Sequence, residues 1–210
     1  MLIIIIVIII ILLTIFLIIN SKNEYTFQEI PHFLTNEECD YLISYSKPLL
    51  TNSHVYDEND DLDKPVDRIS KQCWLDNNID IVKNISEKVS NITKTNIKHQ
   101  ELLQVVRYEE GGHFKEHYDA CDGSPDYCKR MNSFIGPRYI TVLIYLNDNY
   151  NGGETTFPII NKLIKPEKGK AVIFYNVYDD GTIIPESLHQ GNKIKNGHKW
   201  IANKWIRLPS

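Results

Sequence analysis

The sequence predicts a mainly β protein, with helices flanking a jelly-roll (double-stranded β-helix) core that follows an N-terminal transmembrane segment. After Glu101, short runs rich in β-branched and aromatic residues alternate with Gly, Pro, Asn and Asp, which is typical of strands and turns. Before Glu101, two segments have apolar residues at helical spacing, and the first 20 residues are almost entirely apolar. Helices followed by many strands indicate a sandwich or jelly roll with helices packed outside.

Residues 1–20 are predicted to form a membrane anchor. The chain is apolar from Leu2 to Ile19 apart from Thr14, and about 18 such residues in a helix match the hydrocarbon core of a bilayer. A cleaved signal peptide is the alternative, but a basic start and a small-residue cleavage site are not visible. We interpret residues 21–26 as a linker and residues 27–210 as one globular domain.

Two helices are predicted before the strands, over residues 35–50 and 78–94. Thr35 or Asn36 can cap the first helix, and Pro48 ends it. The second has apolar residues at three- and four-residue intervals from Ile81 to Ile92.

An acidic segment, residues 57–67, separates these helices. It begins like a calcium-binding loop, but Leu62 and Arg68 stand where an EF-hand requires Gly and Glu. We therefore expect a mobile, solvated segment rather than a calcium site.

Runs rich in β-branched and aromatic residues predict strands over residues 102–108, 138–147, 170–177 and 199–208. The net charge is −4, and no long basic run is present, which argues against a nucleic-acid partner.

His117 and Asp119 suggest a metal site. Residues two apart in a strand share one face, so both side chains point the same way. The third ligand should be a distant histidine, and we choose His189, near the start of a probable strand and 70 residues beyond Asp119. Earlier His113 and later His198, beside a turn glycine, are the other nearby candidates. Two imidazoles and one carboxylate leave coordination positions open, as in non-haem Fe(II) oxygenases.

Strand parity supplies companions for this site. Lys199 and Trp205 share one face of the last strand. A lysine inside a barrel is costly unless an anion meets it, and a dicarboxylate cosubstrate could be that anion. Trp205 could form a wall of the site and Tyr108 could contribute a hydroxyl. A solvent-facing Lys199 and a core-packing Trp205 are the simpler alternatives.

Cys121 and Cys128 flank a short loop. They are either two unrelated thiols or a local disulfide, which would suit an oxidising compartment. Glycosylation sequons at Asn84 and Asn91 fit such a compartment.

Four segments together resemble the prolyl 4-hydroxylases of the collagen-type and plant/algal-type branch, which are Fe(II)- and 2-oxoglutarate-dependent dioxygenases. The segments are residues 104–120, 138–158, 165–176 and 187–207, supported upstream by residues 33–43 and 67–75. The resemblance implies Fe(II), 2-oxoglutarate, O2 and ascorbate as cofactors and cosubstrates. It also implies 4-hydroxylation of peptidyl proline in proline-rich or collagen-like peptides, and location in the endoplasmic reticulum lumen.

The resemblance assigns roles residue by residue. It makes His117, Asp119 and His189 the iron ligands, and Lys199 the partner of the distal carboxylate of 2-oxoglutarate. Tyr108 and Trp205 match residues near the cosubstrate, and Arg138 matches an arginine that holds the peptide. The acidic segment matches a loop that closes over the peptide. An oxygenase of the same fold acting on lysine or a small molecule, or a non-catalytic jelly-roll binding module, are the alternatives.

Overall fold

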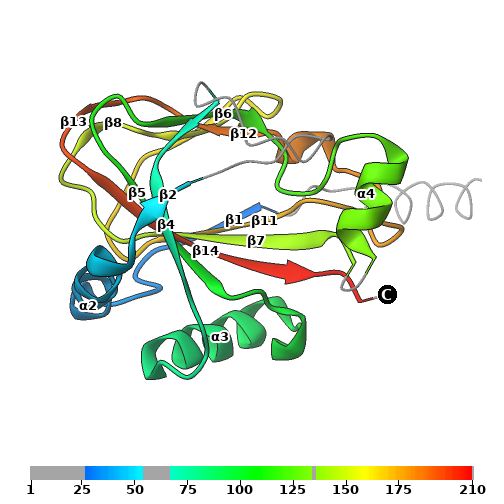
Figure 1. Cartoon of the computed structure of the whole chain (residues 1–210), viewed down its shortest axis with the longest axis horizontal. Coiled ribbons are helices and arrows are strands. Elements are labelled where there is room, and N and C mark those ends of the chain that lie inside the picture. Colours follow the sequence, from blue (N-terminus) through cyan, green and yellow to red (C-terminus); the bar gives the residue numbers. More distant parts are fainter. Residues whose placement is uncertain (1–26, 54–66, 134–135, 210) are drawn as a thin grey trace, which may run out of the picture.

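The computed structural model describes residues 27–53, 67–133 and 136–209 (Figure 1). The predicted anchor, the linker and residues 57–66 of the acidic segment lie outside these ranges. Within them, no helix is both long enough and apolar enough to cross a membrane.

Two antiparallel sheets form the body of the described residues. The larger one has the strand order β1-β11-β7-β14-β5-β4-β2 and the smaller one β10-β9-β12-β6-β3. The strands of the larger sheet, in that order, are Phe27–Ile30, Ala171–Tyr175, Arg138–Tyr145, Lys199–Arg207, Leu103–Tyr108, Lys71–Leu75 and Thr51–Asn52. Those of the smaller sheet are Lys162–Ile164, Thr155–Phe157, His189–Gly191, His113–His117 and Arg68–Ile69. A short ribbon pairs β8 (Asn151–Gly152) with β13 (Ile194–Asn196).

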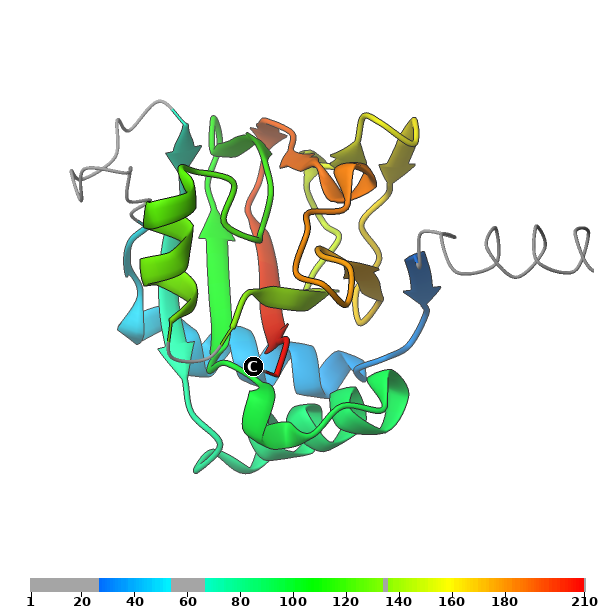
Figure 2. The same ribbon diagram turned by 90° about the vertical axis from the view of Figure 1, so that its right-hand side faces the viewer.

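Helices α2 (Asn36–Ser46) and α3 (Asp80–Thr93) cover one face of the larger sheet (Figures 1 and 2). The predicted cap of α2 is confirmed: Glu38 N donates to Thr35 Oγ1, and Thr35 N donates to the Glu38 carboxylate. Pro48 falls in the 3-10 helix Lys47–Leu49 that follows. Two further 3-10 turns are Ile97–His99 and Pro185–Ser187.

The four predicted strands are confirmed as β5, β7, β11 and β14. Helix α4 (Pro125–Asn132) was not predicted, because it is short and none of its residues is buried. Strand β4 was also missed, because it is short and begins with the polar pair Lys71 and Gln72.

Strand β14 separates two buried layers. Trp200, Ala202 and Ile206 face the helices, in a core that includes Leu42 and Ile85. Fully burying a leucine or isoleucine side chain stabilises the fold by roughly 1.5–3 kcal/mol, so this layer fixes the sheet. Ile201 belongs to the other cluster, between the two sheets. The sheet thus presents a rigid wall to the space between the sheets.

Candidate active site

A cavity of about 580 Å³ lies between the two sheets. Its wall on the larger sheet includes the alternate residues Lys199, Ile201, Asn203 and Trp205 of β14. His117 and His189 line it from the smaller sheet. The predicted parity of β14 is therefore confirmed, since every second residue of the strand faces the cavity.

His117, Asp119 and His189 come together in this cavity. His117 ends β6, His189 begins β12, and the two are cross-strand partners. Their ligand atoms and that of Asp119 all lie within 4.8 Å of one another. His117 Nε2 is 3.8 Å from Asp119 Oδ1, and His189 Nε2 is 3.9 Å from Asp119 Oδ2. The expectation that Asp119 lies on the same strand as His117 is wrong, because β6 ends at His117 and Asp119 lies in the bend that follows.

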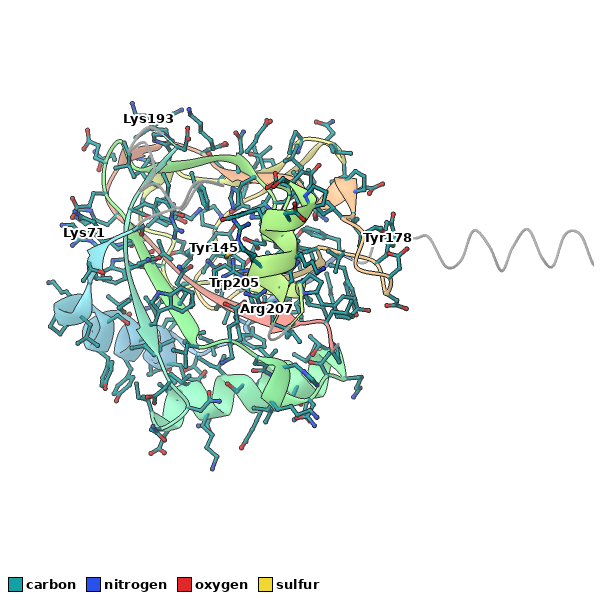
Figure 3. The ribbon with its side chains drawn as sticks, turned by 45° about the vertical axis from the view of Figure 1, so that its right-hand side comes forward. Lys71, Tyr145, Tyr178, Lys193, Trp205 and Arg207 are labelled. Atoms are coloured by element: carbon teal, nitrogen blue, oxygen red, sulfur yellow. A yellow bond between two sulfur atoms is a disulfide. The ribbon has the colours of Figure 1, made fainter. Side chains whose placement is uncertain are left out.

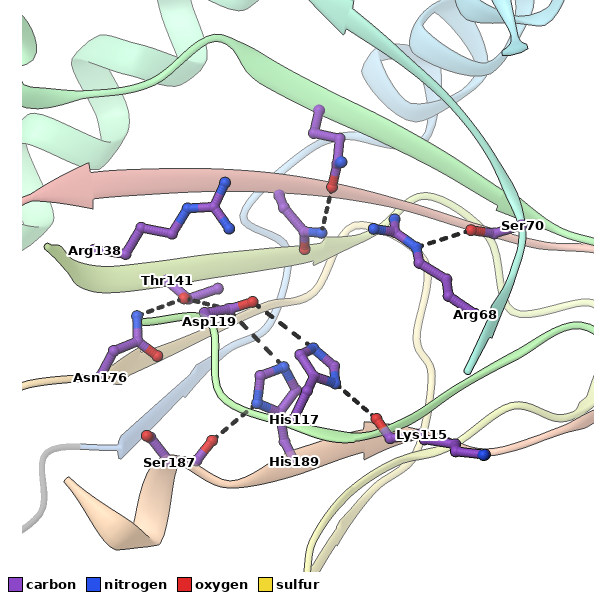
Figure 4. A network of polar contacts seen from close by, with 12 residues as sticks. Arg68, Ser70, Lys115, His117, Asp119, Arg138, Thr141, Asn176, Ser187 and His189 are labelled. Carbon is purple, nitrogen blue, oxygen red and sulfur yellow. Dashed lines mark hydrogen bonds and ion pairs between the residues drawn. The ribbon is translucent and has the colours of Figure 1, made fainter. Parts of the chain in front are cut away.

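The histidine tautomers suit metal binding. His117 Nδ1 is 2.7 Å from the Lys115 carbonyl, and His189 Nδ1 is 2.9 Å from the Ser187 carbonyl (Figure 4). A carbonyl only accepts, so Nδ1 carries the hydrogen in each ring. The lone pair of each neutral ring is then on Nε2, which faces the cluster, as in other metal-ligating histidines.

Electrostatics favour the same state. Burial and the neighbouring His189 lower the pKa of His117 below its usual range. Burial acts to raise the pKa of Asp119, but the two imidazoles, Arg138 and a hydrogen bond from Thr141 outweigh it and lower that pKa. At neutral pH the cluster therefore holds a neutral His117 and an ionised Asp119, as metal binding requires. This donor set fits a non-haem Fe(II) ion. His113 and His198 lie outside the cluster.

Lys199 lines the cavity and is only 2% exposed. Its Nζ donates to the Gly153 carbonyl at 2.7 Å and lies 5.6 Å from the ring centroids of both Tyr108 and Tyr145. Gly153 has φ +68°, a conformation that favours glycine. Burial lowers the pKa of Lys199 to about 7. An anion placed here would favour the charged amine.

Two residues near Lys199, Tyr145 and Thr155, were not predicted from the sequence. Tyr145 Oη donates to Thr155 Oγ1 at 2.7 Å, and both are buried. Thr155 lines the cavity together with Lys199. The signal that could have found Thr155 is its position two residues after the paired glycines Gly152 and Gly153.

Arg138 and Trp205 form the other end of the β14 wall. The Arg138 guanidinium lies 3.6 Å from the Trp205 ring centroid. Its Nε and Nη2 donate to Glu101 at 2.8 and 3.0 Å, and Arg207 Nε donates to the same carboxylate at 2.6 Å. Figure 3 shows Trp205 and Arg207 close together on β14. Six residues of strand span about 20 Å, so Trp205 lies far from Lys199, opposite Thr141 of β7.

Cys121 and Cys128 are joined by a disulfide. The bridge closes the loop that follows Asp119 onto α4, whose Tyr127 and Met131 line the cavity. The disulfide therefore fixes the segment that follows Asp119 covalently.

Comparison with known proteins agrees with this site. Residues 103–207 match the family model of the 2OG-Fe(II) oxygenase superfamily, and the chain belongs to that superfamily. The chain is 34% identical, over 90% of its length and 81% of the relative's, to a prolyl 4-hydroxylase homologue of Acanthamoeba polyphaga mimivirus. It is 36% identical to prolyl 4-hydroxylase 10 of Arabidopsis thaliana, over 84% of this chain and 67% of that one. Within the superfamily, the chain is therefore a member of the prolyl 4-hydroxylase family.

The fold of the described residues is also similar to that of a solved prolyl hydroxylase structure. The viral collagen prolyl hydroxylase of Paramecium bursaria Chlorella virus-1, in its 2-oxoglutarate complex, superimposes with a TM-score of 0.69 at 29% identity. The match covers 88% of this chain and 96% of the viral one. The mainly β, jelly-roll prediction is thus confirmed for the described residues.

Proposed function

We propose that this protein 4-hydroxylates peptidyl proline, coupled to conversion of 2-oxoglutarate into succinate and CO2. One observation carries the proposal: a single cavity holds the cluster of His117, Asp119 and His189 and, on its wall, the buried amine of Lys199. The substrate class is that named for the mimivirus, plant and Chlorella-virus relatives.

In this proposal His117 Nε2, the Asp119 carboxylate and His189 Nε2 hold Fe(II). Bound Fe(II), with 2-oxoglutarate and O2, supplies the oxidising chemistry. Lys199 binds the distal carboxylate of 2-oxoglutarate through a charge-assisted hydrogen bond. Tyr108 covers the Lys199 amine with its ring and is itself buried, so water is kept from this ion pair.

The peptide is proposed to bind at the Trp205 end of the wall. Proline-rich segments adopt an extended polyproline II form and dock on aromatic surfaces. The exposed ring at this end is that of Trp74, which is 41% exposed and lies 5.9 Å from the ring of Trp205, and Trp205 itself is 4% exposed and supports Trp74 and Arg138 from below. Arg138 is held over Trp205 by Glu101, so we propose that it acts on the peptide from a fixed position.

Mass spectrometry tests the activity directly. The detergent-solubilised full-length protein is incubated with proline-rich and collagen-like peptides, Fe(II), 2-oxoglutarate, O2 and ascorbate. We expect a gain of one oxygen at proline with matching succinate. Oxygen gain at lysine in a matched panel, or 2-oxoglutarate turnover with small molecules only, would assign the fold to another substrate. If no succinate forms with any substrate, the protein would be a non-catalytic binding module.

We further propose that residues 1–20 anchor the protein in the endoplasmic reticulum membrane, with the catalytic domain in the lumen. The apolar stretch from Leu2 to Ile19 and the Cys121–Cys128 disulfide support this location. The sequon residues Asn84 and Asn91 are exposed on α3. Glycosidase-sensitive mass that disappears in Asn84→Gln and Asn91→Gln variants would support luminal exposure. Digestion of the domain by protease added to intact microsomes would contradict it.

A further inference from the structure

Two hydrogen bonds in series lie behind Asp119. Thr141 Oγ1 donates to Asp119 Oδ2 at 2.6 Å, and Asn176 Nδ2 donates to Thr141 Oγ1 at 2.8 Å (Figure 4). Thr141 is in the middle of β7, and Asn176 directly follows β11, the neighbouring strand. Thr141 is 1% exposed and Asn176 is 0% exposed. The carboxylate is therefore supported from the sheet by side chains with no access to solvent.

The direction of both hydrogen bonds is fixed by chemistry. An ionised carboxylate only accepts, so the single hydroxyl proton of Thr141 is committed to Asp119. The Thr141 oxygen can then only accept from Asn176, which must present its NH2 group rather than its carbonyl. The series has one polarity, from Asn176 through Thr141 to Asp119, and it favours the ionised carboxylate.

The fold holds Asn176 in place for this contact. Its backbone N donates to the Tyr139 carbonyl at 2.8 Å, and its carbonyl accepts from Ile184 N at 2.9 Å. Its side-chain Oδ1, in contrast, is buried and has no hydrogen-bond partner among the described residues. A buried unpaired acceptor costs stability. An apolar side chain of similar size would avoid that cost, so the contribution of Asn176 lies in its NH2 group.

We propose that Thr141 and Asn176 are positioning residues that orient the Asp119 carboxylate and so set the affinity of the site for its metal. The inference rests on the proposed function, since it takes Asp119 as a ligand. Groups that hydrogen-bond to a metal ligand fix its orientation and basicity, and their loss costs about 10- to 100-fold in metal affinity or activity. Asn176 acts only through the Thr141 hydroxyl.

A metal titration tests the proposal without turnover. Mn(II) is titrated into the full-length protein and the free-ion electron paramagnetic resonance signal is followed. We expect Thr141→Val, which keeps the β-branched shape but lacks the hydroxyl, to weaken Mn(II) binding by about 10- to 100-fold. Thr141→Ser should restore most of the affinity. Asn176→Leu should weaken binding by a smaller factor.

A double-mutant cycle tests the series itself. Once the Thr141 hydroxyl is gone, Asn176 has no route to Asp119, so adding Asn176→Leu to Thr141→Val should weaken Mn(II) binding no further. Ser86→Ala is the matched control. It removes a buried hydroxyl of α3 that bonds to Asn77 and the Val82 carbonyl, and it should lower the melting temperature while leaving the Mn(II) affinity unchanged.

The outcomes separate the two hypotheses. Wild-type Mn(II) affinity in folded Thr141→Val, or multiplicative losses in the double mutant, would overturn the positioning role. If Thr141→Val does not fold, wild-type affinity in Asn176→Leu overturns that role and a weakened affinity supports it. A wild-type protein that binds no Mn(II) in the presence of 2-oxoglutarate would instead contradict the proposed metal site.

Discussion

Two lysines of β14 are buried on opposite faces of the same strand. Lys199 faces the cavity, where its amine meets the Gly153 carbonyl and two tyrosine rings. Lys204 faces the helix-covered side and is 0% exposed, and its Nζ has no hydrogen-bond partner within the described part of the chain. Burial lowers the pKa of Lys199 to about 7 and that of Lys204 to about 8.

The two lysines show that the desolvation of a buried amine has different consequences on the two faces of β14. Burial disfavours the charged form of an amine on either face. On the cavity side, an anionic ligand can offset that penalty and gain a strong contact. For Lys204, Glu101 is the charge that favours the protonated amine, and it is already bonded to Arg138 and Arg207. We therefore expect substitutions on the cavity side to change catalysis, and Lys204 to change stability alone.

The largest expected effect is loss of the metal donors on the cavity side. His117→Ala, Asp119→Ala and His189→Ala should each abolish turnover while leaving the circular dichroism spectrum largely unchanged, because each removes one ligand of an open triad. His113→Ala and His198→Ala, outside the cluster, should retain activity. Normal turnover in His189→Ala would remove that residue from the site.

Lys199→Ala comes next. It should raise the KM for 2-oxoglutarate by about one to two orders of magnitude, because a charge-assisted hydrogen bond is worth roughly 1.5–3 kcal/mol. Lys199→Arg should recover only part of this loss, since a planar guanidinium differs in shape from an ammonium. Steady-state kinetics at saturating peptide measure both. An unchanged KM in the alanine variant would place the cosubstrate elsewhere.

The depressed pKa of Lys199 also predicts a pH dependence. Below about pH 7 the free site already holds the ammonium form that pairs with a carboxylate, and above it the amine must first take up a proton. The KM for 2-oxoglutarate should therefore rise above pH 7, by at most about tenfold per pH unit. Lys199→Arg should flatten this rise, since arginine stays charged. A flat wild-type profile would contradict the expectation.

A smaller kinetic effect is expected from Trp205, at the end of β14 that is remote from Lys199. Trp205→Ala should raise the peptide KM roughly two- to tenfold, because Trp74 and Arg138 would lose an aromatic support worth about 0.5–1.5 kcal/mol. The KM for 2-oxoglutarate should hardly change, because Lys199 is about 20 Å away along the strand. If the 2-oxoglutarate KM rises instead and the peptide KM does not, Trp205 belongs to the cosubstrate pocket.

Lys204→Met should have no effect on turnover and should stabilise the fold. The folded pKa of Lys204 is about 8, below the usual lysine value, so the penalty is full at neutral pH and shrinks as pH rises from about 8 towards 10. One pKa unit corresponds to ~1.4 kcal/mol, so the gain at pH 7 should reach about 3 kcal/mol. Urea unfolding at pH 7 and pH 10 measures it. Equal gains at both pH values would mean that packing, not charge, is responsible.

Local periodicity explains what could be predicted from the sequence. A strand alternates faces every residue, so one assigned strand fixed the common side of Lys199 and Trp205. His189 was chosen as a distant histidine near the start of a probable strand, and its direct pairing with His117 became visible only in the structure. The hydrogen bonds that hold the Asp119 carboxylate could not be predicted from the sequence. Thr141 and Asn176 belong to separate segments, and their contact depends on the register of β7 with β11. The same holds for Glu101, which lies before β5 and binds Arg138 of β7 and Arg207 of β14.

The pairing of His117 opposite His189 has a consequence for how the protein acquires its metal. Backbone pairing of β6 with β12 sets the positions of the two imidazoles, and apolar layers on both faces hold the larger sheet. Because strand pairing fixes the histidine donors, the site cannot select a metal by rearranging around it. Divalent copper and zinc bind such nitrogen and oxygen donors more tightly than ferrous iron does. Metal availability in the cell then contributes to selection, and we expect a zinc-rich expression host to yield inert protein that a chelator followed by Fe(II) restores.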